Sequence, residues 1–222
     1  MGKGGKIFRS VYEVKRRIRY RLIKNREISI ITNNCLGGKL AHDFGLALNS
    51  PLINMQMDPE DFVRFCERME DYLRCPLEEV KEIDQRCRMI FRKLGGEKID
   101  FPVARIDDIY LYLQHYRTFE EAYDAWERRK VRIRKERFYI LVVKADGQSR
   151  NIERFDSLQL QNKLIFTIDK PYQGEVSNSR YMCLNVPKGI HFMDREGRKF
   201  RYYYERFPFL KWFNGKMLYD GF

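Results

Sequence analysis

The chain contains few of the residues that hold zinc sites and disulfide scaffolds together. Three of its 222 residues are histidine and five are cysteine, and it has no CxxC pair or Cys/His cluster at zinc-binding spacing. An odd set of cysteines without a secretory leader is typical of reduced thiols in the cytosol. The apolar runs also fall short of the roughly 18 residues that a membrane-spanning helix needs. We therefore expect a cytoplasmic protein without structural zinc, disulfide bonds or membrane spans.

Acidic residues are nearly absent from the first 26 positions. This segment carries ten Lys or Arg residues and one acid, Glu13, so it accounts for +9 of the formal net charge of +12. Its apolar residues recur at helical spacing, at Ile7, Val11, Val14, Ile18 and Leu22. This pattern predicts a basic amphipathic arm that lies on an anionic membrane surface through residues 1–24, and a solvated tail is the alternative. Nucleic acid is not expected as a partner, because the rest of the chain has no recognition motif.

Residues 27–222 are expected to form a single α/β domain behind the arm of residues 1–26. Hydrophobic residues make up 44% of the chain, which is enough for a packed core. Helix patterns begin at the capping residues Asp58 and Thr118 and alternate with apolar strand candidates. These candidates are Ile28–Ile31, Ile109–Leu113, Phe138–Val143 and Leu164–Ile168. The alternation predicts a mainly parallel sheet with helices on both faces, with antiparallel strands added near the C-terminus.

Two asparagines, a cysteine and two glycines directly follow the first strand candidate. Cys35 therefore lies at the tip of a sharp turn. If a helix begins after this turn, its positive N-terminal end favours the thiolate form of Cys35. The alternative is a buried, inert cysteine in a tight turn.

Four chemically competent side chains each follow the carboxyl end of a strand candidate. Ligands bind at this edge of open α/β sheets, so these side chains are expected to face one crevice. They are Cys35, His115, Asp146 and Asp169. A cysteine nucleophile, a histidine base and an orienting carboxylate would support acyl transfer.

Further residues near these strand ends are expected to bind the substrate. The turn around Cys35 offers donors to a developing oxyanion. These are Asn33, Asn34, Gly37 and Gly38. Lys170 follows the last parallel strand candidate and is a candidate contact for a phosphate or a sugar.

The acidic pair Asp107 and Asp108 is a separate candidate site. Asp108 lies about 23 Å from His115 along an extended strand, so a direct contact between them is not expected. A role in the entry to the strand is favoured, and binding of a divalent metal ion is the alternative.

Several motifs together resemble one bacterial family. They are Ser29-Ile-Ile-Thr-Asn-Asn-Cys-Leu-Gly-Gly38, Asn49-Ser-Pro51, Phe101-Pro-Val-Ala-Arg-Ile-Asp-Asp108, His115-Tyr116, Phe119-Glu-Glu-Ala122, Trp126-Glu-Arg-Arg129, Asn162-Lys163, Lys170-Pro-Tyr172 and Trp212-Phe-Asn-Gly215. The chain is identified as a member of uncharacterised-domain family 1919, which is encoded among capsule and exopolysaccharide biosynthesis genes. One departure is Ala145-Asp-Gly-Gln-Ser149, which keeps Asp146 and Gly147 but lacks the cysteine of the family's Asp-Gly-Cys-Thr stretch.

The resemblance implies a role in surface-polysaccharide biosynthesis, with a polysaccharide or lipid-linked sugar as substrate. The Asn-Cys turn is also similar to that of polysaccharide acetyltransferases that use coenzyme A. We therefore expect a transferase, with acyl transfer favoured, a coenzyme A thioester as candidate donor and no tightly bound cofactor. The alternatives are a metal-dependent glycosyl or sugar-phosphate transferase and a non-enzymatic assembly protein. The arm suits work at the inner face of the membrane.

Overall fold

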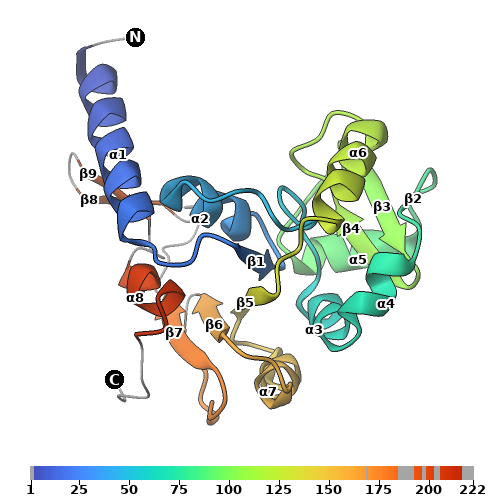
Figure 1. Cartoon of the computed structure of the whole chain (residues 1–222). Coiled ribbons are helices and arrows are strands. Elements are labelled where there is room, and N and C mark those ends of the chain that lie inside the picture. The colour runs from blue at the N-terminus through green and yellow to red at the C-terminus, as the bar shows by residue number, and fades with distance from the viewer. Residues whose placement is uncertain (1–2, 169, 185–192, 197–198, 203–205, 217–222) are drawn as a thin grey trace.

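The computed structural model describes most of the chain (Figure 1). The described residues are 3–168, 170–184, 193–196, 199–202 and 206–216, with side chains from residue 12 onward outside the 193–202 region. The expected site residue Asp169 lies outside the described residues. No helix in the described residues has the length and apolar character needed to span a membrane.

A four-stranded parallel sheet forms the centre of the fold. Its strand order is β1-β5-β6-β7, and every neighbouring pair is parallel. The strands are β1 (Ile28–Thr32), β5 (Glu136–Lys144), β6 (Lys163–Ile168) and β7 (Arg180–Leu184). The predicted α/β class with a mainly parallel sheet is confirmed.

Helices cover both faces of this sheet, and the alternation along β5 shows why. Phe138, Ile140 and Val142 pack on one face together with α2 (Leu36–Phe44) and α8 (Phe209–Phe213). The residues between them point to the opposite face, because successive side chains of a strand alternate. Residues on that second face, Tyr139, Leu141 and Val143, pack with α3 (Pro59–Glu67) and α7 (Ser149–Ser157). Burial on both faces accounts for the continuous apolar run of β5.

A second, antiparallel sheet stands beside the first (Figure 1). Its strands are β2 (Glu78–Glu79), β3 (Val103–Ile106) and β4 (Ile109–Tyr112). One face joins the main core together with α6 (Phe119–Lys130), and the other packs on α5 (Gln85–Lys93). The short helix α4 (Met69–Arg74) completes this part of the chain.

The prediction that Ile109–Leu113 joins the parallel sheet is wrong. Only Asp107 and Asp108 separate β3 from β4, and Asp107 takes the positive φ of 52° that a tight reversal requires. Two residues are sufficient for a hairpin, whereas parallel strands need a crossover of a dozen residues or more.

Antiparallel strands also occur near the C-terminus, as expected. β8 (Met193–Glu196) and β9 (Lys199–Tyr202) pair with each other in a two-stranded sheet of their own. The main sheet is extended at its edge by β7, which runs parallel to β6 and is not one of these antiparallel strands.

Helix α2 begins directly after β1 and lies very close to it. The close approach depends on Gly37, because a Cβ atom there would stand 2.9 Å from Thr32 Oγ1 and 3.2 Å from the Ile30 carbonyl oxygen. The amide of Gly37 donates to Thr32 Oγ1 over 3.1 Å, and the same hydroxyl donates to the Asn34 carbonyl. The glycine therefore lets the chain turn sharply from strand to helix.

Substitution Gly37→Ala tests this packing by the sign of its effect. Alanine stabilises a helix interior by about 0.5–1 kcal/mol relative to glycine, so helix propensity alone predicts a gain. The contacts with Thr32 and the Ile30 carbonyl predict a net loss of about 1–3 kcal/mol instead. Urea denaturation of the two proteins distinguishes these outcomes, and a stabilised variant would show that the close approach is not required.

Candidate functional site

Cys35 occupies the junction between β1 and α2. It is the residue immediately before the first residue of the helix, with φ −68° and ψ −5°, and its side chain is partly buried. The strand preceding it is fully buried, and the glycines after it allow the close return of the chain. The structure thus places the thiol at the strand-to-helix turn that the sequence predicts.

The imidazole of His115 reaches this thiol from the other sheet. His115 Nε2 lies 3.0 Å from Cys35 Sγ, which is hydrogen-bond distance for a sulfur partner. His115 follows β4, so it does not come from the carboxyl end of a parallel strand as expected. The predicted meeting of the two side chains is nevertheless found, and the reason for it lies in how the two sheets are joined.

Backbone hydrogen bonds link the Cys35 turn to the end of β4. The Met57 amide donates to the Asn33 carbonyl over 2.9 Å. The neighbouring Gln56 exchanges two hydrogen bonds with Tyr112, of 2.9 and 2.8 Å. The segment through Gln56 and Met57 therefore acts as a short intervening strand that holds the residues after Tyr112 beside the turn.

A buried arginine fixes the segment that follows His115. Arg129 Nη1 donates to the Tyr116 hydroxyl over 2.6 Å and to the Ile53 carbonyl over 3.2 Å. The Tyr116 hydroxyl in turn donates to the same carbonyl over 3.0 Å. Ile53 packs against α2, where a Cβ atom on Gly38 would stand 3.0 Å from Ile53 Cγ2. Gly38 thus serves the packing that brings the His115 segment to the helix.

Of the two expected carboxylate partners, Asp169 lies outside the described residues, and Asp146 pairs with another residue. Asp146 lines the same cavity as Cys35, but its carboxylate pairs with Lys170 over 2.7 Å, and both side chains are largely exposed. Within the described residues, the side chain of His115 hydrogen-bonds to Cys35. The arrangement is therefore a Cys–His pair, and Lys170 is engaged by a carboxylate and not directed at the thiol.

The residues expected to form an oxyanion hole have structural partners. The Asn33 amide group donates to the Val142 carbonyl and accepts from the Val142 amide, both over 2.9 Å. Asn34 Oδ1 accepts from the Leu36 amide over 3.0 Å. The Gly37 amide donates to Thr32 Oγ1. The donors of Asn33 and Gly37 are thus already engaged within the fold. The contact of Asn34 uses its side-chain oxygen, so a donor role for its amide nitrogen stays a prediction.

Burial sets the protonation of the thiol. Burial of the Cys35 side chain raises the pKa of its thiol to about 11, because a thiolate is poorly stabilised away from solvent. The thiolate expected from the helix N-terminus is therefore not the resting form. The amides of Leu36 and Gly37 point to Asn34 and Thr32, so they do not donate to the sulfur.

Cys35 opens on a cavity of about 410 Å³ between the two sheets. Its walls come from the Cys35 turn, the end of β5, and the end of α5 with the loop after it. Polar residues that sequence reasoning missed also line it, namely Gln56, Lys93, Gln114 and Lys144. No local pattern marks these residues, because they come together from four separate segments. The cavity is large enough for a small acyl donor or part of a larger one.

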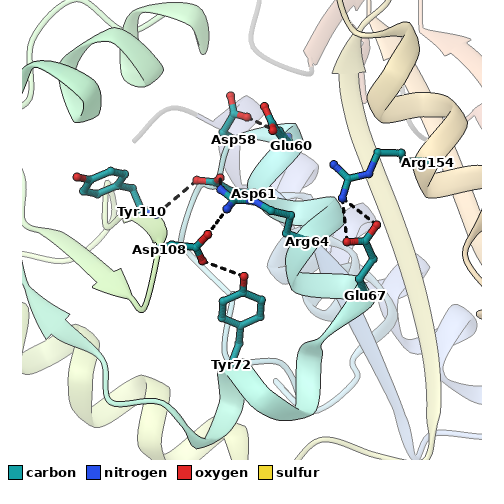
Figure 2. Close-up of polar contacts among 9 residues, drawn as sticks. All are labelled: Asp58, Glu60, Asp61, Arg64, Glu67, Tyr72, Asp108, Tyr110 and Arg154. Atoms are coloured by element: carbon teal, nitrogen blue, oxygen red, sulfur yellow. Dashed lines mark hydrogen bonds and ion pairs between the residues drawn. The ribbon is translucent and has the colours of Figure 1, made fainter.

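Asp108, the second residue of the acidic pair, is part of a different polar cluster, which Figure 2 shows. Asp108 accepts from Arg64 Nη1 and, over 2.9 Å, from the Tyr72 hydroxyl. Arg64 also pairs with the buried Asp61, whose pKa is raised because burial disfavours its charged form. Asp108 thus ties the β3–β4 turn to α3 and α4 through its side chain, whereas the sequence favoured a role at the strand entry.

Removal of the Asn33 side chain is expected to reduce stability. Asn33→Ala leaves the buried amide and carbonyl of Val142 without partners, so we expect a loss of about 2–4 kcal/mol in unfolding free energy. Asn34→Ala, which removes one more exposed acceptor, is the matched control and should cost about 1 kcal/mol or less. Chemical denaturation measures both, and equal small losses would contradict the structural role of Asn33.

Alkylation of Cys35 is expected to be slow at neutral pH. With a pKa of about 11, its thiolate fraction and its rate with iodoacetamide should rise about tenfold per pH unit through pH 9 and 10. An unburied thiol would already level off near pH 9. Peptide mass spectrometry at a series of pH values follows the reaction, and fast labelling of Cys35 at pH 6–7 would indicate a preformed thiolate–imidazolium pair instead.

Comparisons with known proteins agree with the resemblance seen in the sequence. The model of a family described as "Domain of unknown function (DUF1919)" matches residues 5–214, a range that contains both Cys35 and His115. An uncharacterized protein of Haemophilus influenzae is 30% identical over 201 residues, which cover 87% of each chain. On this evidence the chain belongs to the DUF1919 family.

Proposed function

We propose that this protein is an acyltransferase in which Cys35 is the nucleophile and His115 is its general base. The observation that carries the proposal is the 3.0 Å contact between Sγ and Nε2 at the wall of a 410 Å³ cavity. Nucleophile and base within hydrogen-bond reach is the arrangement that covalent acyl transfer requires.

The first half of the reaction loads the enzyme. As Cys35 Sγ attacks the carbonyl carbon of an acyl thioester, its proton passes to His115 Nε2. The tetrahedral intermediate then expels the donor thiolate, which takes that proton from the imidazolium and leaves as a thiol. The protein retains the acyl group as a thioester on Cys35.

The second half transfers the acyl group to an acceptor. His115 removes a proton from an acceptor hydroxyl as its oxygen attacks the thioester carbonyl of acyl-Cys35. The Cys35 thiolate leaves and recovers the proton from His115, so every atom and charge is balanced over the cycle. Because burial keeps the resting thiol protonated, the base is needed in each half-reaction.

Two cationic residues of the cavity support a phosphorylated donor. Lys93 and Lys144 line it from two different segments, beside the acidic Asp58 and Asp146. Cations suit the phosphates of a coenzyme A thioester, which is the donor that we propose. We propose a hydroxyl of a surface polysaccharide, or of its lipid-linked precursor, as the acceptor, and the support for it is the family resemblance.

A reducing compartment supports the chemistry of the thiol. All five cysteines are free, as is usual where thiols are kept reduced. Coenzyme A thioesters are proposed to reach the cavity from the cytoplasm, so we propose a cytoplasmic location.

Acyl-enzyme formation tests the proposal directly. Incubation with acetyl-coenzyme A should add one acetyl group to Cys35, detected by intact-protein and peptide mass spectrometry. Cys35→Ser should abolish the thioester adduct, and His115→Ala should slow its formation by about 10²–10⁴-fold because the base is lost. Cys183→Ser, which changes another partly buried cysteine, is the matched control and should acylate at the wild-type rate.

Two further measurements separate the alternatives. Asp146→Asn should reduce the acylation rate much less than His115→Ala, because Asp146 pairs with Lys170. A metal-dependent glycosyl or sugar-phosphate transferase would instead lose activity with EDTA and keep it in Cys35→Ser. Acetylation that occurs equally in Cys35→Ser and the wild-type protein would refute the thiol mechanism.

A further inference from the structure

Helix α1 (Lys3–Leu22) packs on α2 through one of its faces. The Tyr12 hydroxyl lies 2.8 Å from His42 Nδ1 and donates to the buried carboxylate of Asp43. About two helical turns further on, the Arg19 guanidinium lies over the Phe44 ring, 5.3 Å from its centroid. These contacts hold α1 in a defined orientation along the molecule.

Near its C-terminal end the same face is held by a close backbone approach. Gly45 ends α2 with a φ of 67°, and a Cβ atom on it would stand 3.2 Å from the Tyr20 ring. The guanidinium of Arg26 covers Tyr20, 4.1 Å from the ring centroid. Which side of α1 faces the protein is therefore settled by contacts along its length from Tyr12 to Tyr20.

Another side of α1 presents an aliphatic stripe to solvent. Val14, Ile18 and Leu22 are 52%, 51% and 53% exposed. At 3.6 residues per turn, residues four apart lie about 40° from each other, so the three side chains form one stripe. On average the stripe is rotated by about 110° around the helix from Tyr12 and Arg19. No contact with the described part of the molecule explains why this stripe is aliphatic.

Basic side chains border the stripe on both sides. The helical period places Lys15 on one side and Arg17 and Arg21 on the other, and all three are exposed. The single acid of the segment, Glu13, pairs with Arg16 over 3.1 Å. The free surface of α1 thus combines an aliphatic centre with cationic edges.

We infer that this face of α1 is a docking surface for an anionic lipid bilayer. The stripe of Val14, Ile18 and Leu22 would enter the interface between headgroups and acyl chains, and the cationic edges would meet lipid phosphates. Charge complementarity favours a bilayer over a protein groove, because a bilayer offers an apolar layer bordered by negative charge. Nucleic acid would use the cations but leave the aliphatic stripe in water.

Because α1 is fixed to α2, the docked helix would also orient the cavity. Helix α2 begins directly after Cys35 and ends at the contact with α1. The bilayer would therefore lie at a set distance from the thiol. This inference does not depend on the proposed acyl transfer, since binding is measured without any reaction.

Liposome flotation tests the docking surface. Wild-type protein should float with vesicles of phosphatidylcholine and phosphatidylglycerol, bind phosphatidylcholine vesicles far more weakly, and dissociate as salt is raised. The combined variant Lys15→Glu, Arg17→Glu and Arg21→Glu should lower the affinity by at least about a hundredfold. Ile18→Asp should lower it about tenfold, because it places a charge in the apolar stripe.

Val131→Asp is the matched control for Ile18→Asp. Val131 is 79% exposed and directly follows α6, far along the chain from α1, so its variant should bind as the wild type does. Thermal unfolding checks that every variant is folded. If a charge-reversal variant does not fold, neutral Lys15→Gln, Arg17→Gln and Arg21→Gln replaces it, with loss of the anionic preference as the expected result.

Three results would overturn the inference. The first is wild-type protein that does not float with anionic vesicles, and the second is undiminished flotation of Ile18→Asp and the charge variants. The third is a wild-type dimer, measured by light scattering, that becomes a monomer in Ile18→Asp. The stripe would then be covered by a second copy of the chain. If the wild-type protein does not float but binds RNA, and Ile18→Asp binds RNA equally well, the first result applies and the cations serve nucleic acid instead.

Discussion

The parallel pairing of β1 with β5 is the constraint on which the geometry of the site depends. The backbone register ends at Thr32 and Ile140, and the side chain of Asn33 then continues it by bonding both backbone groups of Val142. The chain therefore leaves the sheet at one defined point. Gly37 allows the following helix to return against the strand, and Cys35 is held between them. A thiol placed this way has little freedom to move, which is what a nucleophile in a preorganised site needs.

The second sheet brings His115 to Cys35 because it is connected to the same turn. Hydrogen bonds from Met57 to Asn33 and between Gln56 and Tyr112 form a continuous path from β1 to β4. Burial keeps the thiol protonated, and the imidazole that could accept its proton lies 3.0 Å away. In the proposed reaction, the sulfur would stay unreactive toward solvent electrophiles until it attacks a substrate in the cavity while His115 takes its proton. Burial would then supply selectivity, and the histidine would supply activation.

Helix α2 relates the site to the N-terminal arm. Its first turn follows Cys35, and its last residues carry the contacts with Arg19 and Tyr20 of α1. The same nine-residue helix therefore joins the candidate nucleophile to the proposed lipid-facing surface. An enzyme that acts on lipid-linked sugars would use such a connection to present its cavity toward the membrane.

Local patterns in the sequence determined the elements of this protein, and long-range packing decided which side chains meet. The apolar runs of β1, β5 and β6, the caps Asp58 and Thr118, and the turn at Cys35 are set by neighbouring residues, so they could be predicted. His115 was predicted beside Cys35, but from the wrong sheet, because the positive φ at Asp107 turns β4 back against β3. The pairing of Asp146 with Lys170 and the use of Asn33 by Val142 followed no local signal. Such contacts join residues up to 109 positions apart, and their geometry depends on how two sheets pack, which no short stretch of sequence encodes.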